Sequence, residues 1–596
     1  MKLSLTFAIF VVAAIAGVKT FIMEQIRQIP YGVSDFRSVR ESGLYYVDKS
    51  MYIEEIERQS RTLIFIRPRR FGKSLFINML RLYYDKNAAG DFDRLFGDLY
   101  IGQHPTPLRN RYQVLYMDFS QIGGNISSLE ENFGEYCTMT LDDFMHRYKD
   151  DYPEDIVEAF FSVKTYSGKL KLIVDNAKRL QIPLYLIIDE YDNFTNVVLN
   201  ELGEEVYHAI THADGFYRDL FKKFKGNFER IFLTGVSPVT LDDLTSGFNI
   251  GWNASTQPEL DKMLGFSTKD VREMFTYYKG VGMLPSDCDI EAMIEEMRPW
   301  YDNYCFAEEC LGDGNTVFNC DMVLYYLRNY VNNHRSPKNM LDPNTKTDYN
   351  KLKKLIQLDK LDGDRKGVLR KITEEGEIIA DLRTSFSAME MTDPEVFPSL
   401  LFYYGMLTIK GTFGSQLILG IPNNNVRKQY YGYLLENYDQ VCDVHQTALK
   451  TGFTKMAFNG QWREPLQYMA DCYARLSSVR DSIEGERNIQ GFFLAYLNLN
   501  DYYITAPEVE LNHGYCDFFL LPNLTHYKSE HSYILEVKYL PKSDFEARAA
   551  QQWDDAVKQI EGYASAPRVE VLRQGTILHK IIMQFCGWEL ARMEEV

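Results

Sequence analysis

The chain has 596 residues, of which 45% are hydrophobic, 14% aromatic and 25% charged, and its formal net charge at pH 7 is −18. This length corresponds to about three or four domains of ordinary size, and the composition is that of a globular protein with several cores. The negative charge argues against a general nucleic-acid coat protein, which would be basic, although it allows a local basic channel. The nine cysteines are scattered and never form Cys-x-x-Cys, so reduced thiols are favoured over a zinc site or a disulfide framework.

The stretch RPRRFGKSL, residues 67–75, follows the apolar run Thr62–Ile66 and resembles a phosphate-binding loop. In the usual loop, G-x-x-x-x-G-K-[ST], the first glycine lets the backbone turn and aim its N–H groups at phosphates. Arg67 occupies that first position. The last three positions are conventional: Gly72, Lys73 and Ser74. Residues 74–84 carry apolar side chains at helical spacing, so the loop is predicted to connect a buried strand to a helix.

An acidic partner for this loop follows a second apolar run, Leu184–Ile188, which is typical of a parallel strand buried on both faces. The run ends in Asp189 and Glu190. In a P-loop enzyme Asp189 would hold Mg²⁺ together with Ser74, and Glu190 would polarise the attacking water. Arg69 and Arg70 of the loop are candidates for binding phosphate or for contacting a partner.

Two further strands complete the predicted sheet. Residues 230–240 place Thr234 and Ser237 at a strand tip, where a hydroxyl could sense a γ-phosphate, and Tyr112–Phe119 ends at Asp118. Strands that alternate with helices predict a doubly wound α/β domain with its ligand at the carboxyl ends of the strands.

An ordered series of motifs runs through the chain: IPYGVSDFRSVRESGLYYVDKS, RPRRFGKSL, LIIDEYDN, FLTGVSPV, WYDNYCF and VFNCDMVLYYL. With these motifs the chain resembles the AAA-ATPase-like proteins common in gut and oral bacteria, from about Ile29 to the C-terminus. The resemblance implies that the arginine-rich loop is the normal form of the motif and that ATP is the nucleotide. Asp48 and Lys49 match a family motif whose role is open between a strand-to-helix cap and a ligand contact.

The middle of the chain shows no catalytic constellation. Residues 265–278 predict a helical lid after the nucleotide domain. Residues 394–431 predict a helix followed by two strands joined by a glycine-containing turn, a pattern that suits a winged-helix module. Such a module either binds DNA or serves only for packing.

Two predicted strands near the C-terminus carry a second set of charged residues. GYCDFFLLP contains Asp517, and SYILEVKYL contains Glu536 and Lys538. Period-two geometry places Glu536 and Lys538 on one face, and a hairpin bend can bring Asp517 beside them. Two carboxylates that hold Mg²⁺ or Mn²⁺ and a lysine that orients or deprotonates water suit metal-assisted phosphodiester cleavage. This is the pattern of PD-(D/E)xK nucleases.

The neighbouring helices add candidates. The helix that begins at GERNIQGFF offers Glu486 as a third acid and metal ligand, with Glu510 as its rival. The helix DDAVKQIEGYA contains Gln559 and Tyr563. A resemblance to RecB-type nucleases implies that this pair flanks the active site and touches the backbone phosphate.

The N-terminus carries the parts of a secretory signal peptide, with Lys2 followed by an apolar run from Leu3 to Ala16 that is short for a membrane span. The alternative is an upstream start codon ahead of a true start at Met23. Because an ATP site needs the cytosol, we favour Met23 and expect a cytoplasmic protein. No stable membrane association is expected unless residues 1–22 are retained.

We therefore expect the following segments: a signal-like or mis-start segment (1–22), an AAA-like P-loop ATPase domain (23–258), a helical lid and winged-helix-like region (259–440) and a PD-(D/E)xK nuclease-like domain (441–596). Two functions compete. The first is an ATPase coupled to a metal-dependent endo- or exonuclease that acts on DNA or RNA. The second is a switch that hydrolyses ATP slowly or not at all, and whose nuclease-like domain only binds nucleic acid or a protein. Either is compatible with a homo-oligomer.

Overall fold

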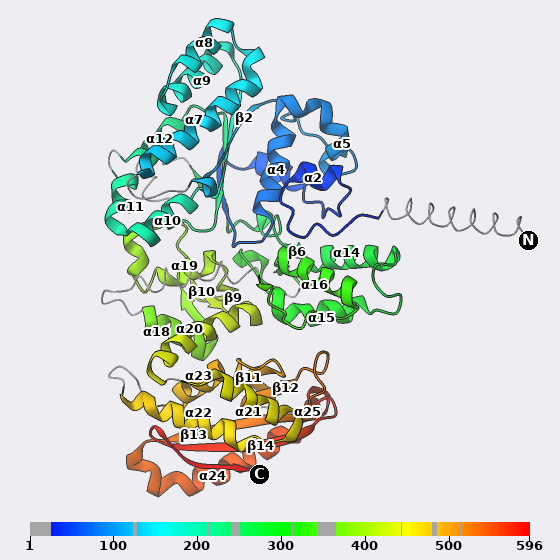
Figure 1. Cartoon of the computed structure of the whole chain (residues 1–596), viewed down its shortest axis with the longest axis vertical. Helices are drawn as coiled ribbons and strands as arrows, with labels where there is room; N and C mark the ends of the chain where they lie inside the picture. The colour runs from blue at the N-terminus through cyan, green and yellow to red at the C-terminus, as the bar shows by residue number, and fades with distance from the viewer. Residues whose placement is uncertain are drawn as a thin grey trace, which may run out of the picture. The chain divides into compact units, whose positions relative to one another are not determined.

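The structure is a computed structural model that describes residues 26–122, 128–212, 215–239, 251–312, 314–343, 365–442, 444–478, 485–512 and 514–596. The chain divides into two compact units (Figure 1). Unit 1 comprises residues 1–334, 342–368 and 378–423, and unit 2 comprises residues 335–341, 369–377 and 424–596. No helix within the described residues is long and apolar enough to cross a membrane. The cysteines whose side chains are described are all free.

Unit 1 is built on a five-stranded sheet with the order β2-β3-β4-β1-β5. All its neighbouring strands are parallel. The strands are β1 (Thr62–Ile66), β2 (Gln113–Asp118), β3 (Leu184–Asp189), β4 (Arg230–Gly235) and β5 (Trp252–Asn253). Every residue of β1, β3 and β4 is buried, as continuous apolar runs require when helices cover both faces of a sheet. The four strands expected from the sequence are confirmed, and β5 is an addition.

Helices flank this sheet on both sides (Figure 1). The helix α4 (Lys73–Tyr84) packs against β2 and β3, and α7 (Leu129–Tyr148) packs against β2 and against α9 (Tyr166–Leu180). The remaining helices of this region are α2 (Phe36–Glu41), α3 (Tyr52–Arg58), α5 (Phe92–Phe96), α6 (Tyr100–Gln103), α8 (Glu154–Ser162), α10 (Asn193–Leu202), α11 (Glu204–Thr211) and α12 (Phe216–Phe224).

The helix expected within residues 265–278 is confirmed, and it belongs to a mostly helical segment, residues 263–333, that is called the lid below. Its helices are α14 (Thr268–Gly280), α15 (Ile290–Tyr301) and α16 (Cys320–Asn333), and two short strands, β6 (Phe266–Ser267) and β7 (Val317–Phe318), pair at its base. A capping box begins α14, in which Ser267 and Asp270 bond each other's backbone N–H groups.

The last part of unit 1 contains α19 (Phe397–Tyr403), followed by β9 (Thr408–Phe413) and β10 (Gln416–Gly420), which pair antiparallel. Gly414, with φ of 64°, lies in the turn between them. The expected order of helix, strand and strand is therefore confirmed. The strand β8 (Glu377–Ala380), which follows α18 (Arg365–Glu375), extends the sheet to the order β8-β10-β9.

Unit 2 is a mixed sheet with the order β11-β12-β13-β14-β15. Only β13 and β14 are parallel among its pairs, and α24 connects them. The strands are β11 (Tyr503–Leu511), β12 (Gly514–Pro522), β13 (His531–Leu540), β14 (Ile577–Cys586) and β15 (Glu589–Glu595). The helices are α20 (Asn424–Cys442), α21 (Gln446–Asn459), α22 (Arg463–Arg475), α23 (Glu486–Leu497), α24 (Lys542–Ala564) and α25 (Pro567–Leu572).

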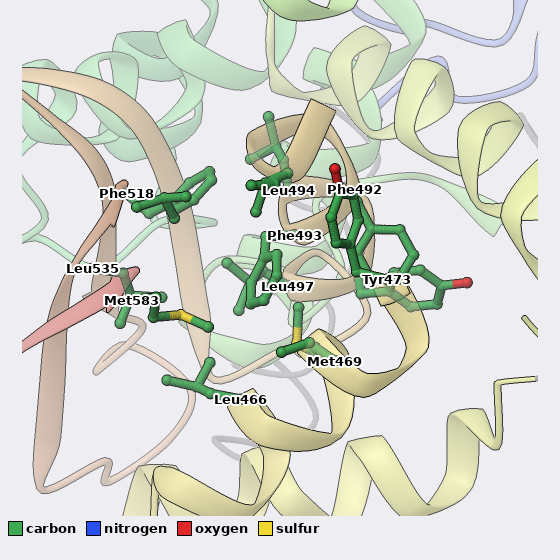
Figure 2. Packing of buried hydrophobic residues seen from close by; sticks show 14 of the residues in the cluster. Leu466, Met469, Tyr473, Phe492, Phe493, Leu494, Leu497, Phe518, Leu535 and Met583 are labelled. Atoms are coloured by element: carbon green, nitrogen blue, oxygen red, sulfur yellow. The ribbon is translucent and has the colours of Figure 1, made fainter. Parts of the chain in front are cut away.

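Each face of this sheet carries its own core. On one face, Phe518, Leu535 and Met583 of the strands pack against α22 and α23, whose contributions include Met469 and Phe493 (Figure 2). On the other face the strands pack against α24 through a second cluster: Phe519, Ile534, Ile582, Trp553, Ile560 and Tyr563. Alternate residues of β13 thus serve opposite cores, which fixes the register of the strand and the position of its charged residues.

Candidate functional site

The loop between β1 and α4 has the backbone of a phosphate-binding turn. Gly72, the residue that caps α4, has φ of 93°, and Arg70 also has a left-handed φ of 67°. The buried ammonium group of Lys73 donates to the carbonyls of Arg67 and Pro68, at 2.9 Å each. The lysine therefore folds back under the loop, and its nitrogen lies beside the carbonyls at the start of the loop.

Arg67, which replaces the usual first glycine, is a structural part of the loop. Its guanidinium is 1% exposed and lies between the rings of Phe65 and Phe306, at 4.3 and 4.1 Å from their centroids. It donates to the carbonyls of Ser255 at 2.5 Å and Asp261 at 3.3 Å. Burial lowers the pKa of Arg67 to about 10, and the Asp261 carboxylate opposes that shift. Arg67 therefore fastens the loop to two distant segments of unit 1.

The acidic residues at the end of β3 lie beside the loop. Asp189 is 2% exposed, and burial raises its pKa to about 6 although a hydrogen bond from Ser74 lowers it. Ser74 and Asp189 thus meet directly, which is the arrangement that a shared Mg²⁺ needs. Glu190 has a left-handed φ of 49° and turns into the pocket in front of the loop.

Thr234 does not reach that pocket. Its buried hydroxyl donates to the carbonyl of Phe65 at 2.7 Å, because β4 lies directly beside β1 and the side chain reaches across to the neighbouring backbone. Ser237, the other residue expected at this tip, is also buried. The structure therefore brings Ser74, Asp189 and Glu190 together and leaves Thr234 as a link between strands.

Sequence analysis missed Asp192 in the same region. Its carboxylate accepts hydrogen bonds from the backbone N–H groups of Val236 and Ser237, the latter at 2.8 Å, and so fixes the end of β4. Burial raises the pKa of Asp192 to about 6. Asp192 is the third acid of the DEYD stretch, which could have marked it as a candidate. Its partners lie more than 40 residues away, so its role could not be inferred from the sequence.

A pocket of about 550 Å³ opens in front of the loop. Its walls come from residues 69–76, from residues 30, 32–34, 45–47 and 49 near the N-terminus, from residues 120, 190 and 193, and from the lid. The cations on its lining are Lys49, Arg69, Arg70 and Lys73. A pocket lined by both cations and apolar side chains can hold a ligand that carries both anionic and apolar groups.

The Asp48–Lys49 motif has two separate structural roles. Asp48 accepts from the backbone N–H groups of Ser50 at 2.8 Å and Tyr100 at 2.7 Å, so it is a cap. Lys49 lines the pocket and forms an ion pair with Asp270 of the lid at 2.7 Å.

In unit 2 the strands β12 and β13 bring the second set of charged residues together. Their backbone ladder pairs Phe518 with Leu535, and extending that register by one residue sets Asp517 opposite Glu536. At this point the Asp517 carboxylate accepts from the backbone N–H of Val537 at 2.6 Å. The ammonium group of Lys538 lies 2.7 Å from Glu536, which is 1% exposed.

The electrostatics of this cluster are those of crowded acids. Burial and the neighbouring Glu536 raise the pKa of Asp517 well above its usual range. Burial raises the pKa of Glu536 too, although Lys538 opposes that shift. The carboxylates together outweigh the burial of Lys538 and raise its pKa. One lysine thus faces more negative charge than it can neutralise, so the cluster favours a proton or a further cation.

The flanking candidates are placed differently. The Glu486 carboxylate accepts from the backbone N–H of Tyr539 at 3.3 Å, in the first turn of α23 and close enough to raise the pKa values of Asp517 and Glu536. Tyr563 is buried beside the acids. Burial raises the pKa of its hydroxyl most, and the neighbouring Glu536 raises it further. Gln559, one turn earlier on α24, is exposed. The side chain of Glu510 lies outside the described residues.

Sequence analysis also missed Gln490. This residue lies one helical turn after Glu486 on α23, and its amide donates to Asp517 at 2.7 Å. Together with the backbone N–H of Val537, it holds both carboxylate oxygens of Asp517. The four-residue spacing from Glu486 was the available signal, because such residues share one face of a helix.

Two family models match the chain. Residues 30–245 match a predicted AAA-ATPase, and residues 484–595 match the PD-(D/E)XK nuclease superfamily. The chain combines an AAA-ATPase-like domain with a PD-(D/E)XK nuclease-superfamily domain. The phosphate loop, Asp189 and Thr234 lie in the first match, and the acids of unit 2 lie in the second.

A curated relative is an uncharacterized protein in the vnfD 5'region of Azotobacter chroococcum mcd 1. It is 24% identical over 302 residues, which is 48% of this chain and 50% of the relative. The chain therefore spans about half the length of the curated relative that it matches.

The acids of the nuclease-superfamily domain fit a divalent cation that keeps most of its water. Among the described residues, no group of three or more His, Cys, Asp or Glu side chains is arranged to hold a metal ion. Mg²⁺ needs only one or two carboxylates beside water, and Asp517 and Glu536 supply them. One carboxylate oxygen of Glu536 is buried without a hydrogen-bond partner, as expected for an atom that would bind a cation.

Proposed function

We propose that this protein is an ATPase coupled to a metal-dependent nuclease that cleaves nucleic acid. The observation that carries the proposal is the cluster of Asp517, Glu536 and Lys538, in which two buried acids with raised pKa values share one lysine. A structural ion pair would balance its charges, whereas this cluster holds two acids and one lysine inside two neighbouring strands.

The proposed cleavage site assigns each residue a role. Asp517 and Glu536 would hold Mg²⁺ or Mn²⁺, which supplies a Lewis acid and an activated water when bound. Lys538, held by Glu536 at 2.7 Å, would orient that water or take its proton. Gln490 fixes Asp517 in position, and we assign Tyr563, with Gln559, to the backbone phosphate.

In the nucleotide site, the loop N–H groups and Lys73 would bind the β- and γ-phosphates, with Arg69 and Arg70 as further cations. Ser74 and Asp189 would hold Mg²⁺, and Glu190 would orient the attacking water. Because a site of this kind would use ATP, we place the protein in the cytoplasm as part of the proposal.

The middle region would serve as a winged-helix-like module. The order α19, β9, β10, with β8 added at the edge, supports this assignment. The turn after β9 exposes Phe413, whose side chain is 64% accessible, as a tip that enters or lies along a nucleic acid would be.

The decisive experiment measures cleavage of labelled single-stranded DNA, duplex DNA and RNA in Mg²⁺ or Mn²⁺, with and without ATP. We expect metal-dependent cleavage that ATP changes and that Asp517→Asn removes. Glu561→Gln is a matched control, because it removes one exposed acid on α24 that pairs with Lys580 rather than with the cluster. Metal-independent cleavage, or cleavage that survives Asp517→Asn, would overturn the proposal. Retained nucleic-acid binding without any cleavage would favour the switch instead.

A further inference from the structure

The lid contacts the phosphate loop at its backbone carbonyls. Phe71 accepts hydrogen bonds from the N–H of Gly265 at 3.1 Å and from the thiol of Cys320 at 3.5 Å. The side-chain amide of Asn319 donates to the carbonyl of Arg69 at 3.4 Å. The start of α16 therefore rests against the back of the loop.

The same end of α16 also holds one of the loop's cations. Asp321 lies in the first turn of α16, and its carboxylate is 2.5 Å from the guanidinium of Arg70. Its backbone N–H donates to the carbonyl of Arg70 at 3.4 Å. Arg70 and Asp321 both line the pocket, with side chains that are 26% and 17% exposed. The Asp321 carboxylate thus lies beside Arg70, a cation that a phosphate group would also bind.

We propose that Asp321 is a positioning residue of the nucleotide pocket, which holds Arg70 against the lid until the phosphates of a nucleotide replace its carboxylate. The inference rests on the proposed nucleotide binding and adds a competing carboxylate to it. A carboxylate in the pocket wall repels an incoming anion and competes for Arg70. A nucleotide must displace Asp321 before it gains Arg70, so this competition costs most for the nucleotide whose phosphates reach Arg70.

A second ion pair also joins a cation of the pocket lining to a carboxylate of the lid. Lys49, also on the pocket lining, pairs with Asp270 of the lid at 2.7 Å and donates to the carbonyl of Lys262 at 3.3 Å. Asp270 is committed to the capping box of α14, so its carboxylate cannot leave without loosening that helix. The Arg70–Asp321 pair contains a cation of the phosphate loop itself, so it is the pair that we assign to the nucleotide.

The test is a double-mutant cycle on nucleotide binding. Isothermal titration would compare ATP, ADP and AMP, each with Mg²⁺, on the full chain and on Asp321→Asn, Arg70→Asn and the double variant. Asparagine suits Arg70 because it tolerates the left-handed backbone at that position. Glu273→Gln is the matched control, since it removes one exposed negative charge from the lid without lining the pocket.

We expect Asp321→Asn to tighten ATP binding by about fivefold or more, the low end of coupling between charges in contact. The gain should decrease from ATP to AMP, should vanish when Arg70 is Asn, and should be absent in Glu273→Gln. Weaker or unchanged ATP binding in Asp321→Asn overturns the inference, as does a gain that persists without Arg70. A parent chain that binds no nucleotide contradicts the proposed function instead, so the two failures are distinguishable.

Discussion

Asp189 is a buried acid whose pKa is set mainly by its burial. Its pKa in the folded protein is about 6, against an ordinary value of 3.8, because burial disfavours the carboxylate. Between about pH 4 and pH 6, Asp189 therefore keeps its proton in the folded state and has released it in the unfolded state. Ionisation costs no stability below about pH 4. The cost grows from there to about pH 6 and is fully present above it.

We predict that Asp189→Asn stabilises the protein in the absence of Mg²⁺ and nucleotide. The free energy of unfolding at pH 7.5 should rise by about 1–3 kcal/mol, the scale of a shift of about two pKa units. Urea unfolding at pH 7.5 and pH 5 would measure this, and the difference should shrink at the lower pH. Mg²⁺-ATP should stabilise the parent and not the variant. Equal differences at both pH values would contradict the argument.

Lys538 makes a second prediction at the scale of the residue. Lys538→Gln should reduce cleavage by about 100-fold or more, as expected when a group that moves a proton is removed. Metal binding at pH 8 should persist, because lysine is no ligand for Mg²⁺, and titration calorimetry would check it. Lys542→Gln is the matched control, since the Lys542 side chain is 65% exposed and its ammonium group lies 3.9 Å from Glu589, a long distance for an ion pair. Full cleavage by Lys538→Gln would exclude the assigned role.

At the scale of the element, the phosphate loop depends on an arginine that its motif does not contain. Arg67 is buried between two rings and beside the carboxylate of Asp261, which itself accepts from the N–H groups of Phe306 and Ala307. Removing the guanidinium would leave a buried acid without its cation and three segments without their common contact. Such losses are among the costly ones in proteins.

We therefore predict that Arg67→Gly, which restores the usual spelling of the loop, destabilises the protein. The free energy of unfolding should fall by about 3 kcal/mol or more, the scale of removing a buried charged group that makes several hydrogen bonds. Thermal and urea unfolding would measure it. Arg69→Gly is the control, because Arg69 is only half-buried in the same loop and the same change should cost far less stability. Equal losses in the two variants would disprove the special role of Arg67.

The same elements show what the sequence could predict. The strands of unit 1 were recognisable because their apolar runs have no polar face, and the loop and Asp189 followed from strand ends. The roles of Arg67 and Thr234 could not be recognised from the sequence, because their partners lie on segments that only the folded chain brings near. Thr234 was expected at the ligand and instead bonds the Phe65 carbonyl. In unit 2, alternation along β13 was enough to place Glu536 beside Lys538.

At the scale of the whole molecule, the two proposed activities lie in units with separate cores. The loop, Asp189 and the lid belong to unit 1, and Asp517, Glu536 and Lys538 belong to unit 2. Each unit has its own sheet, so a substitution in one site should leave the fold of the other intact. Any effect of ATP on cleavage must then pass between the units as a coupling free energy, which acts in both directions for binding.

We predict that Lys73→Ala and Asp517→Ala separate the activities. Lys73→Ala should abolish ATP binding, because we assign Lys73 to the β- and γ-phosphates, and its cleavage rate should equal that of the parent without ATP. Asp517→Ala should lose cleavage while it binds and hydrolyses ATP like the parent. Phosphate release and cleavage of labelled nucleic acid, measured on the same preparations, would test both. If Lys73→Ala still responded to ATP, the nucleotide would act somewhere other than this loop, and the coupling that we propose would have to be abandoned.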